Sequence, residues 1–281
     1  MGTHTGATTT STGATGPAAT TATTAAGPLP RTRAPGIPLV QVWWSRVAPL
    51  DAVAHWLDPW DLTRVSTLRR ADDRARSATG RALLRLVTSR LMEVPPEDVR
   101  VRMLCPLCGS DRHGRPVLGT RHIKHGVRPP QVSISHAGDR VVVALGTTGP
   151  VGVDVERVSA TPDGVAEMAW SAAERAALDL QPEGRSPAAR ARVWVRKEAA
   201  LKATGYGLAV DPSSLTVTTG PGEARVLSWV GHEDWAGCLG LTDLDLGPGY
   251  AGCLAVRRDP AADPQVLLHR VSDPTLRRDR H

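Results

Sequence analysis

The chain has 281 residues, of which 41% are hydrophobic and 22% charged, which are ordinary values for a globular protein. This composition excludes a wholly disordered chain, a collagen-like repeat and a coiled coil. Four cysteines are too few for a secreted disulfide scaffold. Since no apolar stretch approaches the roughly 18 residues that span a membrane, we expect a soluble intracellular protein without a membrane partner.

Basic residues outnumber acidic residues by 34 to 28, which gives a net charge of +6 at pH 7. Such an excess favours anionic partners: phosphorylated ligands, nucleic acid or an acidic protein. Nucleic acid is the least favoured of these, because only 4% of the residues are aromatic and no helix-turn-helix spacing is present. Only three of the basic residues are lysines, and two of them, Lys197 and Lys202, lie five residues apart.

Both ends of the chain have the composition of unstructured segments. Residues 1–30 contain 11 Thr, 7 Ala and 5 Gly and carry no Asp, Glu, Lys or Arg. Such a stretch cannot bury enough apolar surface to offset the entropy of ordering, so we expect a disordered tail over residues 1–37. Residues 259–281 are rich in Arg and Pro, and we expect them to form a loose C-terminal tail.

Between these tails the chain runs through similar elements twice. Each half begins with a short β-rich run, continues with a long helical stretch and closes with a further strand. In chain order these elements are Leu39–Val47, Leu62–Met92 and Arg140–Leu145, then Val151–Val158, Ser171–Thr204 and Tyr250–Val256. The pattern predicts an α+β fold of two similar α/β lobes, residues 38–149 and 150–258, in a pseudo-twofold arrangement with the active site in the cleft between them. Two coincidentally similar halves are the alternative.

Two carboxylates interrupt the apolar run Pro150–Arg157. On a strand, side chains at i and i+2 project from the same face. Asp154 and Glu156 therefore lie side by side, while Val153 and Val155 point into the core. Adjacent carboxylates repel, and a hard divalent cation such as Mg²⁺ relieves that repulsion while also binding phosphate oxygens. A solvated strand face that carries two charges is the alternative.

The segment Trp194–Lys202 consists of strong helix formers. Trp194, Glu198 and Lys202 recur at four-residue intervals and share one stripe of that helix. A third carboxylate and a cation on this stripe could complete a metal site and contact a phosphate. A surface Glu–Lys pair is the alternative.

The segment Val132–Gly138 alternates like a strand and ends at a turn. Ser133 and Ser135 then share one face, and His136 lies at the strand terminus, where hydroxyl and imidazole groups can hold a phosphate. No Gly-x-Ser-x-Gly elbow surrounds these serines, which excludes a hydrolase of that type. A hydrogen-bonded structural role is the alternative for His136.

Taken together, the three segments resemble the 4′-phosphopantetheinyl transferase superfamily, in its two-lobed, single-chain Sfp-type branch. The resemblance covers roughly residues 39–257. The motifs that carry it are Ser135-His136, Gly152-x-Asp154-x-Glu156 and Trp194-x-x-Lys197-Glu198-x-x-x-Lys202. It implies a cytoplasmic monomer that moves the phosphopantetheine arm of coenzyme A to a serine of an acyl or peptidyl carrier protein and releases 3′,5′-ADP. A catalytically inactive module that only binds coenzyme A or a nucleotide is the alternative.

The resemblance also implies roles for the residues of these motifs. Asp154, Glu156 and Glu198 would ligate Mg²⁺ together with the coenzyme A pyrophosphate. Glu198 would act as general base toward the carrier serine, directly or through water. The metal would neutralise phosphate charge. Asp154, Glu198 and Lys202 are thus the expected catalytic residues.

The same resemblance assigns cationic and hydroxyl groups to coenzyme A. Lys202 would pair with the pyrophosphate, and Ser135 with His136 would hold coenzyme A phosphates. Lys197 also matches the motif, without an evident role. An acidic recognition helix on the carrier protein would suit the basic excess of this chain.

The first half of the chain adds three arginines to the expected coenzyme A site. Arg115 lies in Gly114-Arg115-Pro116, which resembles the Gly-Lys-Pro turn of the family, so Arg115 would contact the nucleotide end. Gly80–Arg85 resembles the start of a family helix. By this resemblance Arg81 and Arg69 would contact the 3′-phosphate.

A Cys-x-x-Cys motif, Cys105 and Cys108, lies outside the family motifs, with His113, His122 and His125 nearby. This combination could bind zinc, but the second Cys-x-x-Cys of a typical zinc site is missing. Two thiols with no metal are the alternative.

Overall fold

The computed structural model describes residues 39–119, 128–147, 149–158, 168–182, 186–258 and 264–271. The expected N-terminal tail, residues 1–37, lies outside this range, and so do His122 and His125. None of the described helices is long and apolar enough to cross a membrane.

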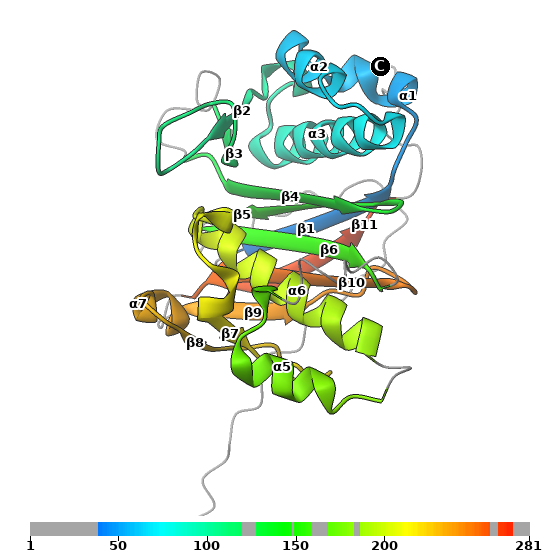
Figure 1. Ribbon diagram of the computed structural model, residues 1–281. Coiled ribbons are helices and arrows are strands. Elements are labelled where there is room, and N and C mark those ends of the chain that lie inside the picture. The colour runs from blue at the N-terminus through cyan, green and yellow to red at the C-terminus, as the bar shows by residue number, and fades with distance from the viewer. Residues whose placement is uncertain are drawn as a thin grey trace, which may run out of the picture.

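Runs of strands and runs of helices follow one another along the chain, as expected for an α+β fold (Figure 1). The strands are β1 (Leu39–Arg46), β2 (Val101–Leu104), β3 (Arg115–Leu118), β4 (Gln131–Ala137), β5 (Arg140–Gly146), β6 (Val151–Arg157), β7 (Leu215–Val217), β8 (Val226–Trp229), β9 (Leu239–Asp243), β10 (Tyr250–Arg257) and β11 (Gln265–Arg270). The helices are α1 (Leu50–Val53), α2 (Pro59–Ser66), α3 (Ala71–Met92), α5 (Ala172–Asp179), α6 (Ser186–Thr204) and α7 (Glu233–Ala236).

Two sheets stack at the centre of the molecule, each covered on its outer face by one long helix (Figure 1). The first sheet has the strand order β11-β1-β5-β4 and is covered by α3; the second has the order β6-β10-β9 and is covered by α6. Strands β4 and β6 are edge strands of the two sheets and lie next to each other. The site residues predicted on β4, β6 and α6 are therefore brought to one region of the fold.

Alternation of apolar side chains explains how both faces of each sheet are buried. On β1, Val40, Val42 and Trp44 point toward the second sheet, whereas Trp43 packs with α3. Val153 and Val155 of β6 are fully buried between the sheets, as their alternation with the carboxylates predicts. The hydrophobic contacts that form the core thus also fix the direction in which the intervening polar residues project.

The C-terminal segment is not loose throughout, which corrects the expectation for residues 259–281. Residues 265–270 form β11, which pairs in parallel with β1 of the first sheet. Leu268 is buried in the core, and the backbone amide of Val271 donates to the carbonyl of Trp44 at 2.8 Å. The apolar run Val266–Leu268 is short and lies among Arg, Asp and Pro residues, so the composition of the segment does not predict a strand.

The expected helix over Leu62–Met92 is likewise two helices, α2 and α3. Asp58 caps α2 by accepting from the backbone amide of Asp61 at 2.8 Å, and Pro59 occupies its first turn. Gly80 lies in the interior of α3, so Gly80–Arg85 is not a helix start. A Cβ at position 80 would come within 3.1 Å of the Ile134 side chain, which explains a glycine where α3 meets β4.

Candidate active site

A cavity of about 910 Å³ lies where the two halves of the chain meet. Its walls come from α3, the β2–β3 hairpin, β4, β6, the part of α6 from Trp194 onward and the turn that follows α6. All three acidic motif residues reach it, together with most of the predicted cations. The predicted site residues that line it are Arg81, Arg115, Ser135, His136, Asp154, Glu156, Glu198 and Lys202.

Serine side chains connect the two edge strands at the cavity. The backbone amides of Val153 and Val155 donate to the hydroxyls of Ser133 and Ser135, at 3.0 and 3.4 Å. These bonds satisfy backbone groups of β6 that have no strand partner on this side. The two serines share one face of β4, as predicted, and their hydroxyls link the two sheets beside Asp154.

A glycine on β6 brings α6 against the strand. A Cβ at Gly152 would overlap the carbonyl oxygen of Ala199 and the amide nitrogen of Ala203, so only glycine allows this approach. The close contact places Glu198 and Lys202 opposite Asp154. Trp194 lines the same cavity, as expected for residues four apart on one face of a helix.

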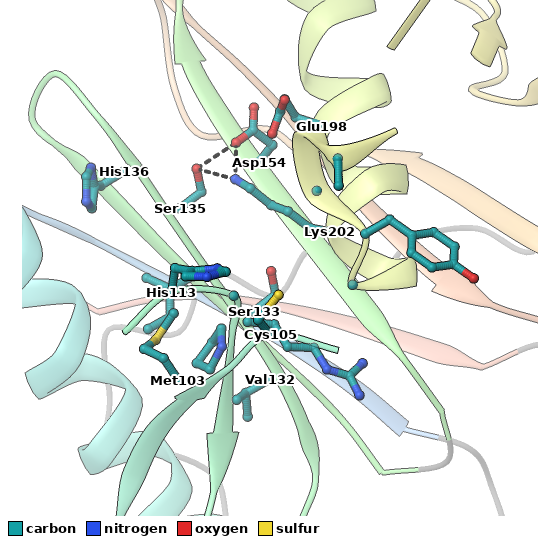
Figure 2. A pocket seen from close by; sticks show the side chains of 18 of the residues that line it. Met103, Cys105, His113, Val132, Ser133, Ser135, His136, Asp154, Glu198 and Lys202 are labelled. Atoms are coloured by element: carbon teal, nitrogen blue, oxygen red, sulfur yellow. Dashed lines mark hydrogen bonds and ion pairs between the residues drawn. The ribbon is translucent and has the colours of Figure 1, made fainter. Parts of the chain in front are cut away.

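Lys202 forms an ion pair with Asp154 across this contact (Figure 2). Its Nζ lies 2.5 Å from Asp154 Oδ1, and Ser135 Oγ donates to the same oxygen at 2.7 Å. Burial alone would lower the pKa of Lys202, but the surrounding carboxylates, Asp154 first, raise it above its ordinary value. Lys202 is therefore a fixed cation bound to β6, which excludes the surface Glu–Lys pair considered above.

The negative charge of Asp154, Glu156 and Glu198 exceeds the positive charge of Lys202, which faces them. Burial, followed by repulsion from Asp154, raises the pKa of Glu156 to about 7. The pKa of Glu198 is also raised, mainly by burial and further by Asp154, against the opposing effect of Lys202. Asp154 Oδ2 and Glu198 Oε1 are buried and have no hydrogen-bond partner among the described residues.

These orphaned oxygens fit a divalent cation, which would satisfy both and relieve the repulsion. The acidic side chains are not gathered into a finished ligand cage, however. Among the described residues, the only group of three whose ligand atoms all lie within 4.8 Å of one another is Cys105, Cys108 and His113. Asp154, Glu156 and Glu198 line the cavity as a more open set, with Lys202 at Asp154 Oδ1.

Lys197 belongs to a different part of the molecule, although it is adjacent to Glu198 in sequence. Its ammonium is fully buried, 2.5 Å from Glu174, and donates to the carbonyls of Ala169 and Pro212. Glu174 also accepts from the backbone amide of Val217. This network joins α5, α6 and β7, so Lys197 has a structural role outside the cavity.

The three predicted arginines of the first half have different positions. Arg81 and Arg115 line the cavity, and Nε of Arg115 is buried without a hydrogen-bond partner in the described part of the chain. Arg69 is exposed and is not part of the cavity wall. Asp61 holds Arg81 through an ion pair of 2.5 Å.

Asp61 is not among the residues predicted from the sequence. It is fully buried and also pairs with Arg85, which in turn lies 2.7 Å from Asp58. The Asp-Pro dipeptide at the start of α2 was the available signal, because it marks a helix N-terminus whose first turn favours acidic residues.

His136 lies apart from the triangle of Ser135, Asp154 and Lys202 (Figure 2). It is exposed on the rim of the cavity at the end of β4. Ser135 already accepts hydrogen bonds and donates to Asp154 within the protein. Ser135 is therefore buried against Asp154, whereas His136 is exposed on the rim of the cavity.

Two family models match adjacent parts of the chain. The model of the 4′-phosphopantetheinyl transferase superfamily matches residues 150–244, and the model "4′-phosphopantetheinyl transferase, N-terminal" matches residues 41–148. Together they account for more than two thirds of the sequence. The boundary between them lies between β5 of the first sheet and β6 of the second.

Similar proteins bear related names. The chain is 29% identical over 196 residues to 4′-phosphopantetheinyl transferase psf-1 of Bacillus pumilus, which covers 70% of this chain and 77% of that protein. It is 28% identical over 162 residues to 4′-phosphopantetheinyl transferase HetI of Nostoc sp., with 57% of this chain and 64% of the relative covered.

Solved structures show a weaker likeness. The holo-[acyl-carrier-protein] synthase of Thermotoga maritima aligns with 39% of this chain and 63% of its own, at a TM-score of 0.32 and 22% identity. That TM-score is too low to establish a shared fold. On the strength of the two family models and the named relatives, the chain belongs to the 4′-phosphopantetheinyl transferase superfamily, as a member of the Sfp type.

Proposed function

We propose that the protein transfers the 4′-phosphopantetheine arm of coenzyme A to a serine of an acyl or peptidyl carrier protein, with Mg²⁺, and releases 3′,5′-ADP. The observation that carries the proposal is the pair of orphaned buried oxygens, on Asp154 and Glu198, in a cavity that also holds Lys202 and Arg115. Unsatisfied carboxylates next to cations suit a metal bound together with a polyphosphate.

The residues of the second half would hold the metal. Asp154, Glu156 and Glu198 offer carboxylate oxygens. Burial, followed by repulsion from Asp154, raises the pKa of Glu156, so its charged form would gain from a bound cation. Bound Mg²⁺ would neutralise charge on the pyrophosphate and stabilise the departing phosphate oxygen.

Several cations that line the cavity would hold coenzyme A. Lys202, anchored by Asp154, faces the carboxylates and would pair with the pyrophosphate. Arg115 and Arg81, which line the same cavity, would contact the nucleotide end and its 3′-phosphate. His136, exposed at the end of β4, would contribute a phosphate contact. The hydroxyl of Ser135 already bonds to Asp154, Val155 and Lys202, so the structure gives no support to the phosphate contact expected of it. Arg69, which lies outside the cavity wall, has no support from the structure for the phosphate contact expected of it.

Glu198 is the proposed general base. Burial raises its pKa in the metal-free protein, and its Oε1 has no hydrogen-bond partner among the described residues that would compete for a proton. The carrier serine would give its proton to Glu198 while its oxygen bonds to the phosphorus that carries phosphopantetheine. The bond from this phosphorus to 3′,5′-ADP breaks in the same exchange.

We further propose that residues 38–149 and 150–258 are two related lobes with the active site between them. One long helix on one sheet in each half supports this division. The pseudo-twofold relation, the monomeric state and the cytoplasmic location are part of the same proposal. They rest on the sequence pattern and the family resemblance.

The intact mass of an apo carrier protein tests the proposal. Incubation with coenzyme A, Mg²⁺ and the protein should add one phosphopantetheine to the carrier, and Asp154→Ala should abolish the gain. Binding of coenzyme A without a mass gain on fatty-acid, polyketide and peptide-synthetase carriers would instead favour the inactive binding module.

A further inference from the structure

The loop between β2 and β3 brings two cysteines and a histidine together on one side of the cavity. One ligand atom each of Cys105, Cys108 and His113 lies within 4.8 Å of the other two. Cys108 Sγ is 3.4 Å from His113 Nε2. None of the four cysteines forms a disulfide.

The backbone of the loop is arranged around the Cys105 sulfur. The backbone amides of Leu107 and Cys108 form hydrogen bonds to this sulfur. The loop is closed by hydrogen bonds from the Cys105 amide to the Ser110 carbonyl and from the Gly109 amide to the Cys105 carbonyl, both at 2.9 Å. Gly109 has a φ of +71°, which allows this tight turn.

We propose that Cys105, Cys108 and His113 bind a zinc ion, with the fourth coordination position open to the cavity. Two thiolates and an imidazole are typical zinc ligands, and a three-residue set leaves one tetrahedral position for water or a ligand atom. All three residues line the cavity, so a position on that side would be open to it. Figure 2 shows His113 and Cys105 near one another, on the side of the cavity away from Glu198.

The zinc ion would fix the turn that carries Arg115. His113 directly precedes Gly114, whose φ is +101° and where a Cβ would overlap the backbone of Leu104 and Cys105. The metal would therefore clamp both ends of the loop, 105 and 113, and hold Arg115 at the cavity. This consequence rests on the proposed function, whereas the metal site itself does not.

Metal analysis of the full-length protein tests the site without coenzyme A or a carrier. Untagged protein purified from zinc-supplemented cultures should retain about one zinc per chain after dialysis. Cys108→Ser and His113→Ala should lose most of it. Cys238→Ser, which removes a half-buried thiol elsewhere, should retain it.

A histidine-to-cysteine exchange separates ligation from folding. His113→Cys should restore zinc, since a three-cysteine set also binds this metal, and cobalt substitution should give the intense absorption of a tetrahedral thiolate site. Equal zinc in the wild type and in Cys108→Ser, or a mass two hydrogens lower that shows a Cys105–Cys108 disulfide, would overturn the proposal.

The positioning role has its own readout. If the metal orders the turn, removal of zinc with a zinc-selective chelator in excess Mg²⁺ should raise the KM for coenzyme A more than it lowers kcat. Zinc that is bound but leaves both constants unchanged on removal would overturn the role of the metal in holding Arg115. Absence of any transfer by the zinc-loaded protein would count against the proposed function and leave the metal site standing.

Discussion

Glu198 combines a raised pKa with a buried oxygen that has no partner among the described residues. Such a group costs stability in the folded protein, because a buried charge loses hydration. A catalytic carboxylate at this position would explain why the cost is tolerated, since a general base needs an accessible lone pair directed into the cavity.

The substitution Glu198→Gln separates the effect of this carboxylate on stability from its proposed role in catalysis. We expect the rate of carrier modification, measured by intact mass, to fall by roughly 10²–10⁴-fold, the usual contribution of a general base. The free energy of unfolding without metal should stay equal or rise, because a buried charge is removed. Glu223→Gln, at an exposed glutamate, is the matched control and should change neither quantity. A Glu198→Gln enzyme of normal rate would refute the assignment.

Glu156 should make the metal-free protein less stable as the pH rises. Its pKa is about 7 in the folded protein against a reference value of 4.5, so the folded state binds more protons between these values. Stability must therefore fall as the pH increases from 4.5 to 7, by at most about 3 kcal/mol. Urea unfolding in chelator should show this slope, and Glu156→Gln should flatten it. An equal slope in both proteins would contradict the shifted pKa.

At the scale of elements, the site depends on how closely α6 approaches β6. Gly152→Ala should destabilise the protein by roughly 1–3 kcal/mol or more, since the new Cβ meets backbone atoms of α6 that cannot rotate away. Gly149→Ala, three residues earlier, is the control, because its nearest neighbour would be an ordinary contact at 3.9 Å. Equal midpoints of urea unfolding in the two variants would contradict the packing argument.

The buried pair of Lys197 and Glu174 holds elements together and does not take part in the site. Lys197→Met should lower stability by about 3–5 kcal/mol, because Glu174 is left as an uncompensated buried charge. The double variant with Glu174→Gln should recover part of the loss. Activity per folded molecule should stay near the wild-type value in the double variant, and a large loss there would show that Lys197 acts in catalysis.

At the scale of the whole molecule, the sequence predicts which side chains share a face of one strand or helix better than it predicts contacts between distant elements. Alternation on β6 correctly places Asp154 and Glu156 on one face, because burial of Val153 and Val155 leaves no other register. The four-residue spacing correctly places Glu198 and Lys202 on one side of α6.

Contacts distant in sequence could not be predicted in this way. Nothing local shows that Asp154 Oδ1 accepts from both Ser135 and Lys202, or that Lys197 points to Glu174 on another helix. Strand β11 was missed for the same reason, since its pairing partner lies more than 200 residues away. The composition of residues 259–281 indicates a polar segment, but it does not show that part of this segment pairs with β1 at the edge of the first sheet.

That strand makes the stability of the first half depend on residues that follow the second. Leu268 is buried between the sheets, and the ring of His269 stacks on Trp43 at 4.0 Å. Leu268→Ala should therefore cost about 2–5 kcal/mol, as for other large-to-small changes in a core. Gln265→Ala, at the exposed start of β11, should cost little.

Hydrogen exchange locates the effect. If β11 completes the first sheet, Leu268→Ala should speed amide exchange on β1 more than on the strands of the second sheet that lie farther from it, such as β9. Uniform acceleration would mean that the molecule opens only as a whole, and unchanged protection of β1 would show that the parallel pairing does not hold the sheet edge. In the expected case, residues 264–271 are a structural part of the first half, and any fragment that ends before them lacks one edge strand of its sheet.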